Sequence, residues 1–105
     1  MKLGAAGMGR FSEPAILILE SLADGTKHGY AMMEDIRRRH EIHLGPGTLY
    51  GAIARLEEAG LIEALPAEDR RRPYRLTAAG AGALSEQLQS LHRFAAGGLR
   101  RLAPS

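Results

Sequence analysis

The sequence has no cysteine, no tryptophan and no long apolar run. Without cysteine the chain forms neither disulfides nor thiolate metal sites, which is compatible with a cytoplasmic protein. No segment reaches the run of about 18 apolar residues that a membrane-spanning helix needs. The N-terminal stretch MKLGAAGMGR also lacks the apolar core of a secretory signal. We therefore predict a cytoplasmic protein that does not cross a membrane.

Residues arranged for catalysis are missing as well. The chain has no thiol nucleophile, and none of its serines stands in the Gly-x-Ser-x-Gly setting of a hydrolase. Glu57 and Glu58 are adjacent and point to different sides of a helix, so they form no carboxylate pair. His40 and His43 have the spacing of half a metal site but no clear third ligand. We predict a protein that is not an enzyme and that uses no metal or other cofactor.

What the sequence does have is basic charge in clusters. The net charge is only +2, but the triplet Arg-Arg-Arg occurs twice, at 37–39 and at 70–72. Local clusters favour binding to a polyanion more than the net charge does. The first triplet falls at the end of a predicted helix, where cations stabilise the helix dipole, so we favour a structural role for it.

Apolar periodicity and capping residues predict four helices. The first has Ser12 as its N-cap and ends near Gly25, and Thr77 caps the last. In the second helix, Tyr30, Met33 and Ile36 fall at helical spacing and form the predicted apolar stripe. The other three helices are expected over about 28–39, 46–59 and 78–102.

Two short segments predict β-strands. LIEAL at 61–65 and PYRLT at 73–77 form a β-hairpin with a seven-residue tip, 66–72. In the connector before the third helix, Ile42 and Leu44 are candidates for a brief strand pairing.

This order of elements is that of a winged helix-turn-helix with an added C-terminal helix. We predict a mostly α fold with a small β-hairpin, divided into a flexible leader (1–11), a winged helix-turn-helix DNA-binding domain (12–77) and a C-terminal dimerisation helix (78–105). Apolar residues recur along the last helix as in a coiled coil, and a second copy is the simplest cover for them. The predicted dimer-interface residues are Leu84, Leu88, Leu91, Ala95 and Leu102.

The third predicted helix begins with Gly-Pro-Gly and has a thin outer face. With Leu49, Ile53 and Leu56 inward, the outward positions are Gly47, Thr48, Gly51, Ala54, Arg55 and Glu58, with Tyr50 at the border. Such a helix fits a major groove about 12 Å wide, and its free N–H groups attract phosphate. The alternative is that both glycines pack against the second helix and Tyr50 fills the core.

DNA contacts are predicted from three places. The start of the second helix crosses the DNA backbone in a helix-turn-helix, and arginines at the hairpin tip neutralise phosphates or enter a minor groove. The alternative for the tip is a solvated loop partly neutralised by Glu68 and Asp69. The predicted DNA-binding residues are Lys27, His28, Thr48, Tyr50, Gly51, Arg55, Arg70, Arg71 and Arg72.

Three segments together resemble the PadR family of bacterial transcription regulators. They are LADGTKHGYAMMEDI, LGPGTLYGAIARLEEAGLIE and DRRRPYRLTAAGAGAL. The resemblance covers roughly residues 12–85 and is to the short subgroup with a single C-terminal helix. It implies a dimeric winged helix, usually a repressor, at a palindromic promoter site. DNA contacts are implied for the third helix, the wing and the start of the second helix.

We therefore predict a sequence-specific double-stranded DNA-binding transcription regulator, acting as a homodimeric repressor at a palindromic operator. Its third helix would enter the major groove, and the wing at 66–72 would lie on the flanking backbone or minor groove. An unidentified small-molecule effector is a further candidate partner. The alternative is a winged-helix protein-interaction module without a DNA target, which would not need the arginine-rich tip.

Overall fold

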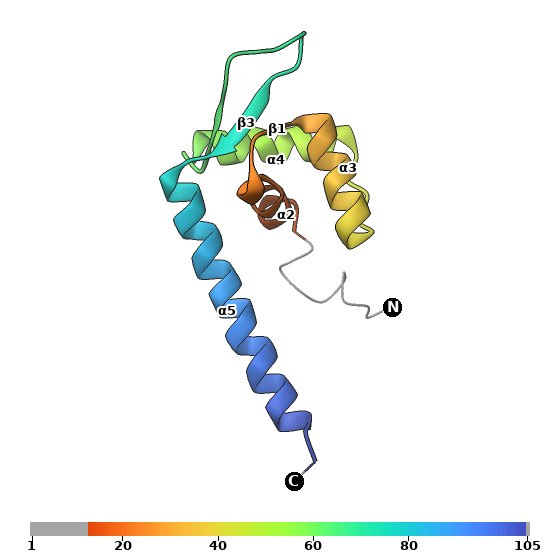
Figure 1. Cartoon of the computed structure of the whole chain (residues 1–105), viewed down its shortest axis with the longest axis vertical. Helices are drawn as coiled ribbons and strands as arrows, with labels where there is room; N and C mark the ends of the chain where they lie inside the picture. The colour runs from red at the N-terminus through yellow and green to blue at the C-terminus, as the bar shows by residue number, and fades with distance from the viewer. Residues whose placement is uncertain (1–12, 105) are drawn as a thin grey trace.

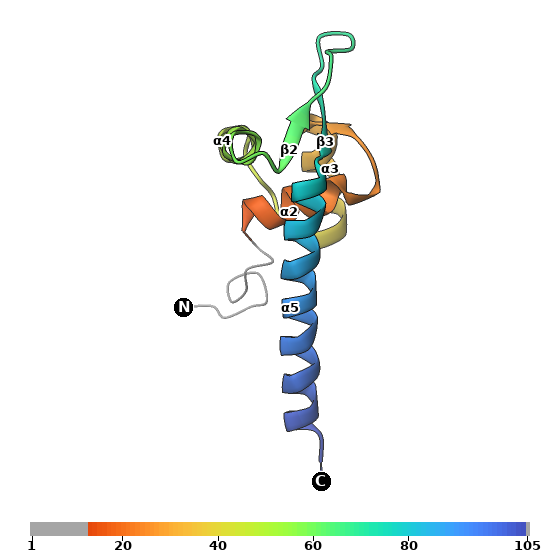
Figure 2. The ribbon, with the colours of Figure 1, turned by 90° about the vertical axis from the view of Figure 1, so that its left-hand side faces the viewer.

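The computed structural model of the chain describes residues 13–104. Helices α2, α3 and α4 and a small sheet form a head, from which the long helix α5 extends as a rod (Figure 1; Figure 2 is the view at a right angle). The predicted fold class is confirmed. The elements are, in order, α2 (Pro14–Ser21), the 3₁₀ turn η2 (Leu22–Asp24), β1 (Lys27–His28), α3 (Gly29–His40), α4 (Pro46–Glu58), β2 (Ile62–Ala64), β3 (Pro73–Leu76) and α5 (Ala78–Leu102).

The helix ends follow their local sequence. The first residue of α4 is Pro46, and proline suits the first turn of a helix. After the helix ends, Gly60 takes a left-handed conformation, at φ 77°, and changes the direction of the chain. The Thr77 hydroxyl accepts a hydrogen bond from the Gly80 N–H at 3.0 Å, which confirms it as the cap of α5. α2 is shorter than predicted, because η2 takes over at Leu22. The predicted cap Ser12 lies outside the described residues, and Glu13 occupies the N-cap position.

The sheet has one strand that the sequence did not indicate. Its order is β1-β3-β2, with both pairs antiparallel, and β1 is a two-residue strand in which Lys27 lies opposite Tyr74. The prediction of a strand at Ile42 and Leu44 is wrong. Glu41 ends α3 in a left-handed conformation, at φ 57°, and Leu44 then turns into the core without pairing.

The core lies between α2, α3, α4 and the start of α5. Leu49, Ile53 and Leu56 of α4 are buried, as the periodicity predicted. The apolar stripe predicted for α3 was Tyr30, Met33 and Ile36, and the buried stripe differs from it by one residue on the side of Tyr30. Met32 and Ile36 are buried, whereas Tyr30 is 60% exposed and so is not a core residue. Among residues 13–104, no helix is long and apolar enough to span a membrane.

The first turn of α5 is fixed against the segment that follows α4. The Thr77 N–H donates to the Leu61 carbonyl at 3.1 Å, and the Thr77 hydroxyl donates to the Gly60 carbonyl at 2.6 Å. Gly80 passes so close that a Cβ there would lie 2.9 Å from the Leu61 carbonyl carbon. Because that neighbour is backbone, it cannot rotate away. The small size of Gly80 therefore sets the direction in which α5 leaves the head.

We expect Gly80→Ala to destabilise the protein by about 1–3 kcal/mol, through overpacking against the Leu61 backbone. Gly82→Ala is the matched control, since a Cβ at Gly82 meets nothing within 4 Å. In the same helix it should stabilise by about 0.5–1 kcal/mol, as alanine does over glycine. Urea unfolding of both variants measures the difference, and equal effects would show that the contact with Leu61 is not limiting.

Candidate nucleic-acid interface

The outer face of α4 is thin and exposed. Thr48, Ala54 and Arg55 are exposed on this face, and Gly51 is half-buried. The Arg55 side chain runs back along the helix, so that a Cβ on Gly51 would lie 3.6 Å from Nη1 of Arg55. Tyr50 is 48% exposed and does not fill the core. The face therefore carries a hydroxyl, a guanidinium and little bulk, and another molecule has access to it.

The wing, the seven-residue tip that the sequence predicted at 66–72, contains a short paired ribbon of its own. The Leu65 N–H donates to the Pro73 carbonyl at 2.9 Å, and Glu68 and Arg71 exchange backbone hydrogen bonds of 2.7 and 2.8 Å. The two residues between them, Asp69 and Arg70, have φ of 47° and 68°. This is the two-residue hairpin turn with positive φ at both positions, whose twist matches paired strands. The ribbon therefore holds Arg70 at its apex.

The start of α3 contacts the wing through His28. As N-cap of α3, His28 accepts a hydrogen bond at Nδ1 from the Ala31 N–H, at 3.4 Å. Its Nε2 lies 3.3 Å from Nη1 of Arg71. A neutral histidine that accepts at Nδ1 carries its proton on Nε2, and arginine has only donors. Arg71 therefore donates to Nε2 only when the His28 proton lies on Nδ1, so the neutral ring makes one of these two contacts at a time, and either one keeps it beside the wing or the start of α3.

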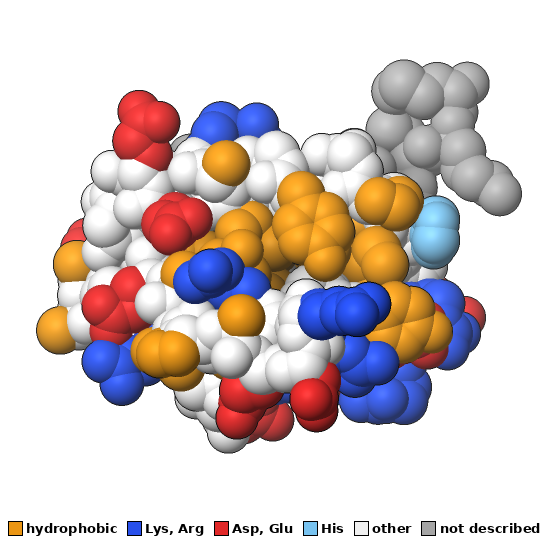
Figure 3. All heavy atoms as spheres, turned by 90° about the horizontal axis from the view of Figure 1, so that it is seen from above, with side chains coloured by type: hydrophobic (Ala, Val, Ile, Leu, Met, Phe, Trp, Pro, Cys, Tyr) orange, Lys and Arg blue, Asp and Glu red, His pale blue; other side chains and the backbone are white. Residues whose placement is uncertain are grey.

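A single cleft brings together side chains from α3, α4 and the wing. Of the predicted DNA-binding residues, the cleft contains His28 from β1, Tyr50 from α4 and the three wing arginines. Thr48, Gly51 and Arg55 lie outside it on α4. Seen from the wing end, lysine and arginine side chains lie beside a patch of hydrophobic and tyrosine side chains (Figure 3). The residues lining the cleft are His28, Gly29, Tyr30, Tyr50, Arg70, Arg71, Arg72 and Tyr74.

Lys27 does not belong to this cleft. Its ammonium group donates to the carbonyl of Ser21 and to the carboxylate of Asp24, the latter at 2.5 Å. Only 18% of the Lys27 side chain is exposed. The hydrogen bond and charge of Lys27 lower the pKa of the Asp24 carboxyl. Lys27 therefore closes the turn between η2 and β1, and its contact with phosphate stays a prediction.

Comparison with known proteins gives a consistent result. The model of the transcriptional regulator PadR-like family matches residues 18–86. The chain belongs to this family. A transcriptional regulator from Mycobacterium tuberculosis is 40% identical over 81 residues, which are 74% of this chain and 75% of that protein. An uncharacterised 37.1 kDa protein of a Streptomyces fradiae transposon is 43% identical over 84 residues. Those residues are 80% of this chain, but only 24% of the length of that protein.

A solved structure supports the fold of this PadR-like chain. The crystal structure of a PadR family transcription regulator from Clostridium difficile superposes with a TM-score of 0.76 at 27% identity. The match covers 86% of this chain and 98% of that one. The winged-helix architecture inferred from the order of elements is therefore shared over most of both chains.

The apolar residues of α5 fall into two groups. Leu84 is 4% exposed and belongs to the core of its own chain, which leaves little of it for a partner, and Leu91 packs partly against that core. Leu88, Ala95 and Leu102 are exposed. The seam prediction missed Phe94 and Leu99, which are 82% and 69% exposed. The described part of α5 therefore presents a larger apolar surface near its end than the predicted seam contained.

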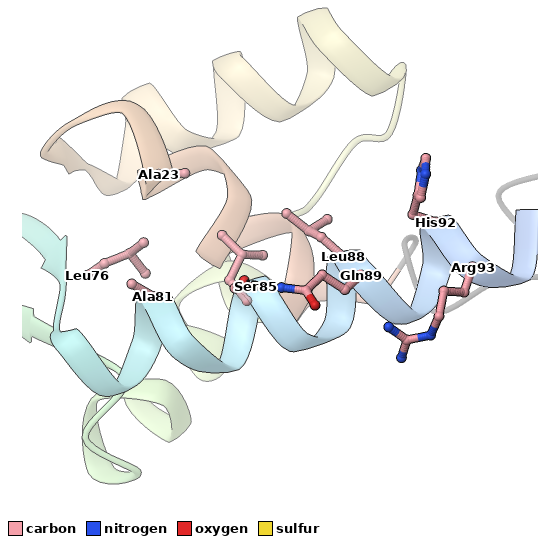
Figure 4. Close-up of a pocket in the computed structure, with 9 residues that line it drawn as sticks. Ala23, Leu76, Ala81, Ser85, Leu88, Gln89, His92 and Arg93 are labelled. Atoms are coloured by element: carbon pink, nitrogen blue, oxygen red, sulfur yellow. Dashed lines mark hydrogen bonds between the residues drawn. The ribbon is translucent and has the colours of Figure 1, made fainter. Parts of the chain in front are cut away.

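A second hollow of about 740 Å³ runs along α5 where it faces η2 and β3. Alanine and leucine side chains make up most of its lining, and Gln89, His92 and Arg93 add polar groups toward the C-terminal end of α5. In Figure 4, His92 and Arg93 leave α5 on different sides, while Leu88 turns toward the head. The lining residues are Ala23, Leu76, Ala81, Leu84, Ser85, Leu88, Gln89, His92 and Arg93.

A buried carboxylate fixes α3 to α2 and so supports the cleft. Asp35 accepts hydrogen bonds from the Ser21 hydroxyl at 2.7 Å and from Nε of Arg39 at 3.1 Å. Burial by itself raises the pKa of Asp35, but these hydrogen bonds outweigh it and lower the pKa. Arg37 and Arg39 also pair with Glu34 and Glu20. All three arginines of the first triplet lie in the last turn of α3 and pair with carboxylates, which is consistent with the structural role predicted for them.

The possible metal ligands of the connector point elsewhere. Nε2 of His40 lies 2.7 Å from a carboxylate oxygen of Glu20 in α2, whereas His43 is exposed in the connector between α3 and α4. Within residues 13–104, no three histidine or carboxylate side chains come close enough to hold a metal ion.

Sequence reasoning missed three of the residues that line the cleft. Gly29, Tyr30 and Tyr74 come from the start of α3 and from β3. The adjacent letters His-Gly-Tyr at 28–30 were a usable signal, since a glycine next to a cap leaves space for another side chain. Tyr74 is buried in the core and reaches the cleft only because β3 is the central strand.

We expect Asp35→Asn to destabilise the protein by about 1–3 kcal/mol at pH 7, because a neutral amide replaces the acceptor of charged hydrogen bonds. Since the folded pKa of Asp35 is lowered, its contribution is present above the unfolded pKa of about 3.9 and is lost as the pH falls through the folded value. The difference between variant and wild type should therefore shrink from pH 7 to pH 3.

Urea unfolding at both pH values measures this difference. The control is Glu58→Gln, at an exposed carboxylate of α4, which should change stability by less than about 0.5 kcal/mol at either pH. A destabilisation by Asp35→Asn that stays constant between pH 7 and pH 3 would contradict a role for the charge.

Proposed function

We propose that this PadR-like regulator binds double-stranded DNA in a sequence-specific manner through the face that carries the cleft. α4 would enter the major groove, and the wing, residues 66–72, would lie on the flanking backbone or minor groove. The observation that carries the proposal is the cleft itself, where His28, Tyr50 and the arginines at 70–72 meet from three separate elements.

The chemistry of the cleft fits a phosphate backbone. None of its eight lining residues is acidic, and three are arginines. The Arg71 guanidinium and the His28 ring lie side by side in the cleft, where a phosphate oxygen could bind to either. Thr48 and Arg55 lie further along the exposed face of α4. There, a hydroxyl and a guanidinium suit base edges in the major groove.

We further propose that the chain acts as a homodimer and represses transcription at a palindromic operator. Phe94, Leu99 and Leu102 are exposed on α5, further along the helix than Leu91, which packs partly against the core. Burying such side chains against a second copy is favourable, and twofold pairing matches a palindromic site. Repression is the usual mode of action of the family that the sequence resembles.

The wing contact is tested by Arg71→Ala. We expect weaker binding to every DNA sequence, and a slope of log K against log salt concentration reduced by about one unit. Arg101→Ala removes the same charge from the last turn of α5 and should leave the slope unchanged. Fluorescence anisotropy with a labelled duplex at several salt concentrations gives the slope. An equal slope for Arg71→Ala and wild type would exclude the wing contact.

The reading role of α4 is tested by selecting bound sequences from random duplex DNA. The wild type should enrich a palindrome with half-sites about 34 Å apart. Thr48→Val and Arg55→Ala should each relax preference at particular base pairs, by about 1–3 kcal/mol. If both variants select the wild-type sequence with the same affinity, α4 is not the reader. If the wild type enriches nothing and is not retained on DNA, the protein-interaction alternative gains support.

A further inference from the structure

Gly29, the first residue of α3, is buried beneath the ring of Tyr50 from α4. A Cβ built on Gly29 would lie 2.6 Å from Cζ and 2.8 Å from Cε1 of Tyr50, closer than a real Cβ atom approaches a neighbour. The φ of Gly29 is not among the positive values, so its backbone suits any residue. The absence of a side chain at Gly29 therefore leaves the space that the end of the Tyr50 ring occupies, and a larger residue would displace that ring.

The contact determines where the Tyr50 ring lies. Tyr50 is about half exposed, and an exposed tyrosine on a helix samples several side-chain rotamers. Here the hydroxyl end of the ring rests on the Gly29 backbone. Both residues line the cleft that also contains the arginines at 70–72. The space left by Gly29 therefore lets the Tyr50 hydroxyl lie in the same cleft as the arginines of the wing.

We infer that Gly29 is a positioning residue for DNA binding, which seats Tyr50 across the gap between α3 and α4. Without that seat, the ring would have to leave the cleft or push the start of α3 away from α4. Either change moves the Tyr50 hydroxyl relative to His28 and Arg71, the groups proposed to bind phosphate. The inference concerns the proposed DNA-binding function and rests on it, but the seating itself has a readout that needs no DNA.

The experiment is a double-mutant cycle with Gly29→Ala, Tyr50→Ala and the double variant, in the full chain. In the Tyr50→Ala background there is no ring to displace. Gly29→Ala should then raise the melting temperature by about 2–4 °C, because alanine is the better helix former. With Tyr50 present, the ring has to leave its position, so the same substitution should raise the melting temperature by less than in the Tyr50→Ala background. Gly82→Ala is the control, and its effect should be the same with tyrosine or alanine at position 50.

The DNA arm uses the duplex selected by the wild type. Gly29→Ala should weaken binding roughly tenfold when Tyr50 is present, and less than about twofold in the Tyr50→Ala background. A purely structural glycine would weaken binding equally in both backgrounds, and that result would overturn the inference. So would a melting-temperature change of the same size in both backgrounds.

Two further outcomes are distinguishable. If Gly29→Ala does not fold but the double variant does, the clash with Tyr50 is established; if neither folds, the inference fails. If the wild type binds no DNA, the proposed function fails. The positioning role of Gly29 for DNA then fails with it, although the melting temperatures still show whether Gly29 seats the ring.

Discussion

The pairing of β3 with a strand on each of its edges joins all the parts of the candidate interface. β1, on one edge, leads directly into α3, while β2, on the other edge, follows α4. β3 itself continues into α5 through Thr77. The wing is the extension of the β2–β3 pair beyond the sheet. The position of the wing relative to both helices therefore depends on a few backbone hydrogen bonds to one four-residue strand.

Rigidity beneath the cleft comes from two different kinds of packing. α4 is held by its buried leucines and isoleucine, which leave its outer face free. α3 is held partly by Asp35, whose carboxylate joins it to Ser21 at the end of α2. A buried carboxylate is stable only when it is fully hydrogen-bonded, so this network also fixes the rotation of α3 about its own axis. That rotation places Gly29 under Tyr50.

Local signals in the sequence predicted the elements better than their contacts. The prediction of α4 was accurate because the proline at its start, the apolar spacing along it and the glycine after its end all indicate the same helix. The predicted apolar stripe of α3 was displaced on one side, because Tyr30 and Met33 have the same helical spacing as the residues that are buried. Only tertiary packing distinguishes the two sets. A strand as short as β1 has no periodicity to detect. In α5, likewise, spacing alone does not distinguish Leu84, which packs in the core of its own chain, from residues that stay exposed and available to a partner.

The turn at the wing apex places Arg70 in a left-handed conformation, at the position where glycine would relax the backbone. Left-handed φ at such a residue costs on the order of 1 kcal/mol. A chain shaped for stability alone would carry Asn-Gly here and lose the apical guanidinium. Homologous wings with glycine at the second position would thus be firmer but less cationic. The apex is a site where folding and charge impose opposite demands on the same residue.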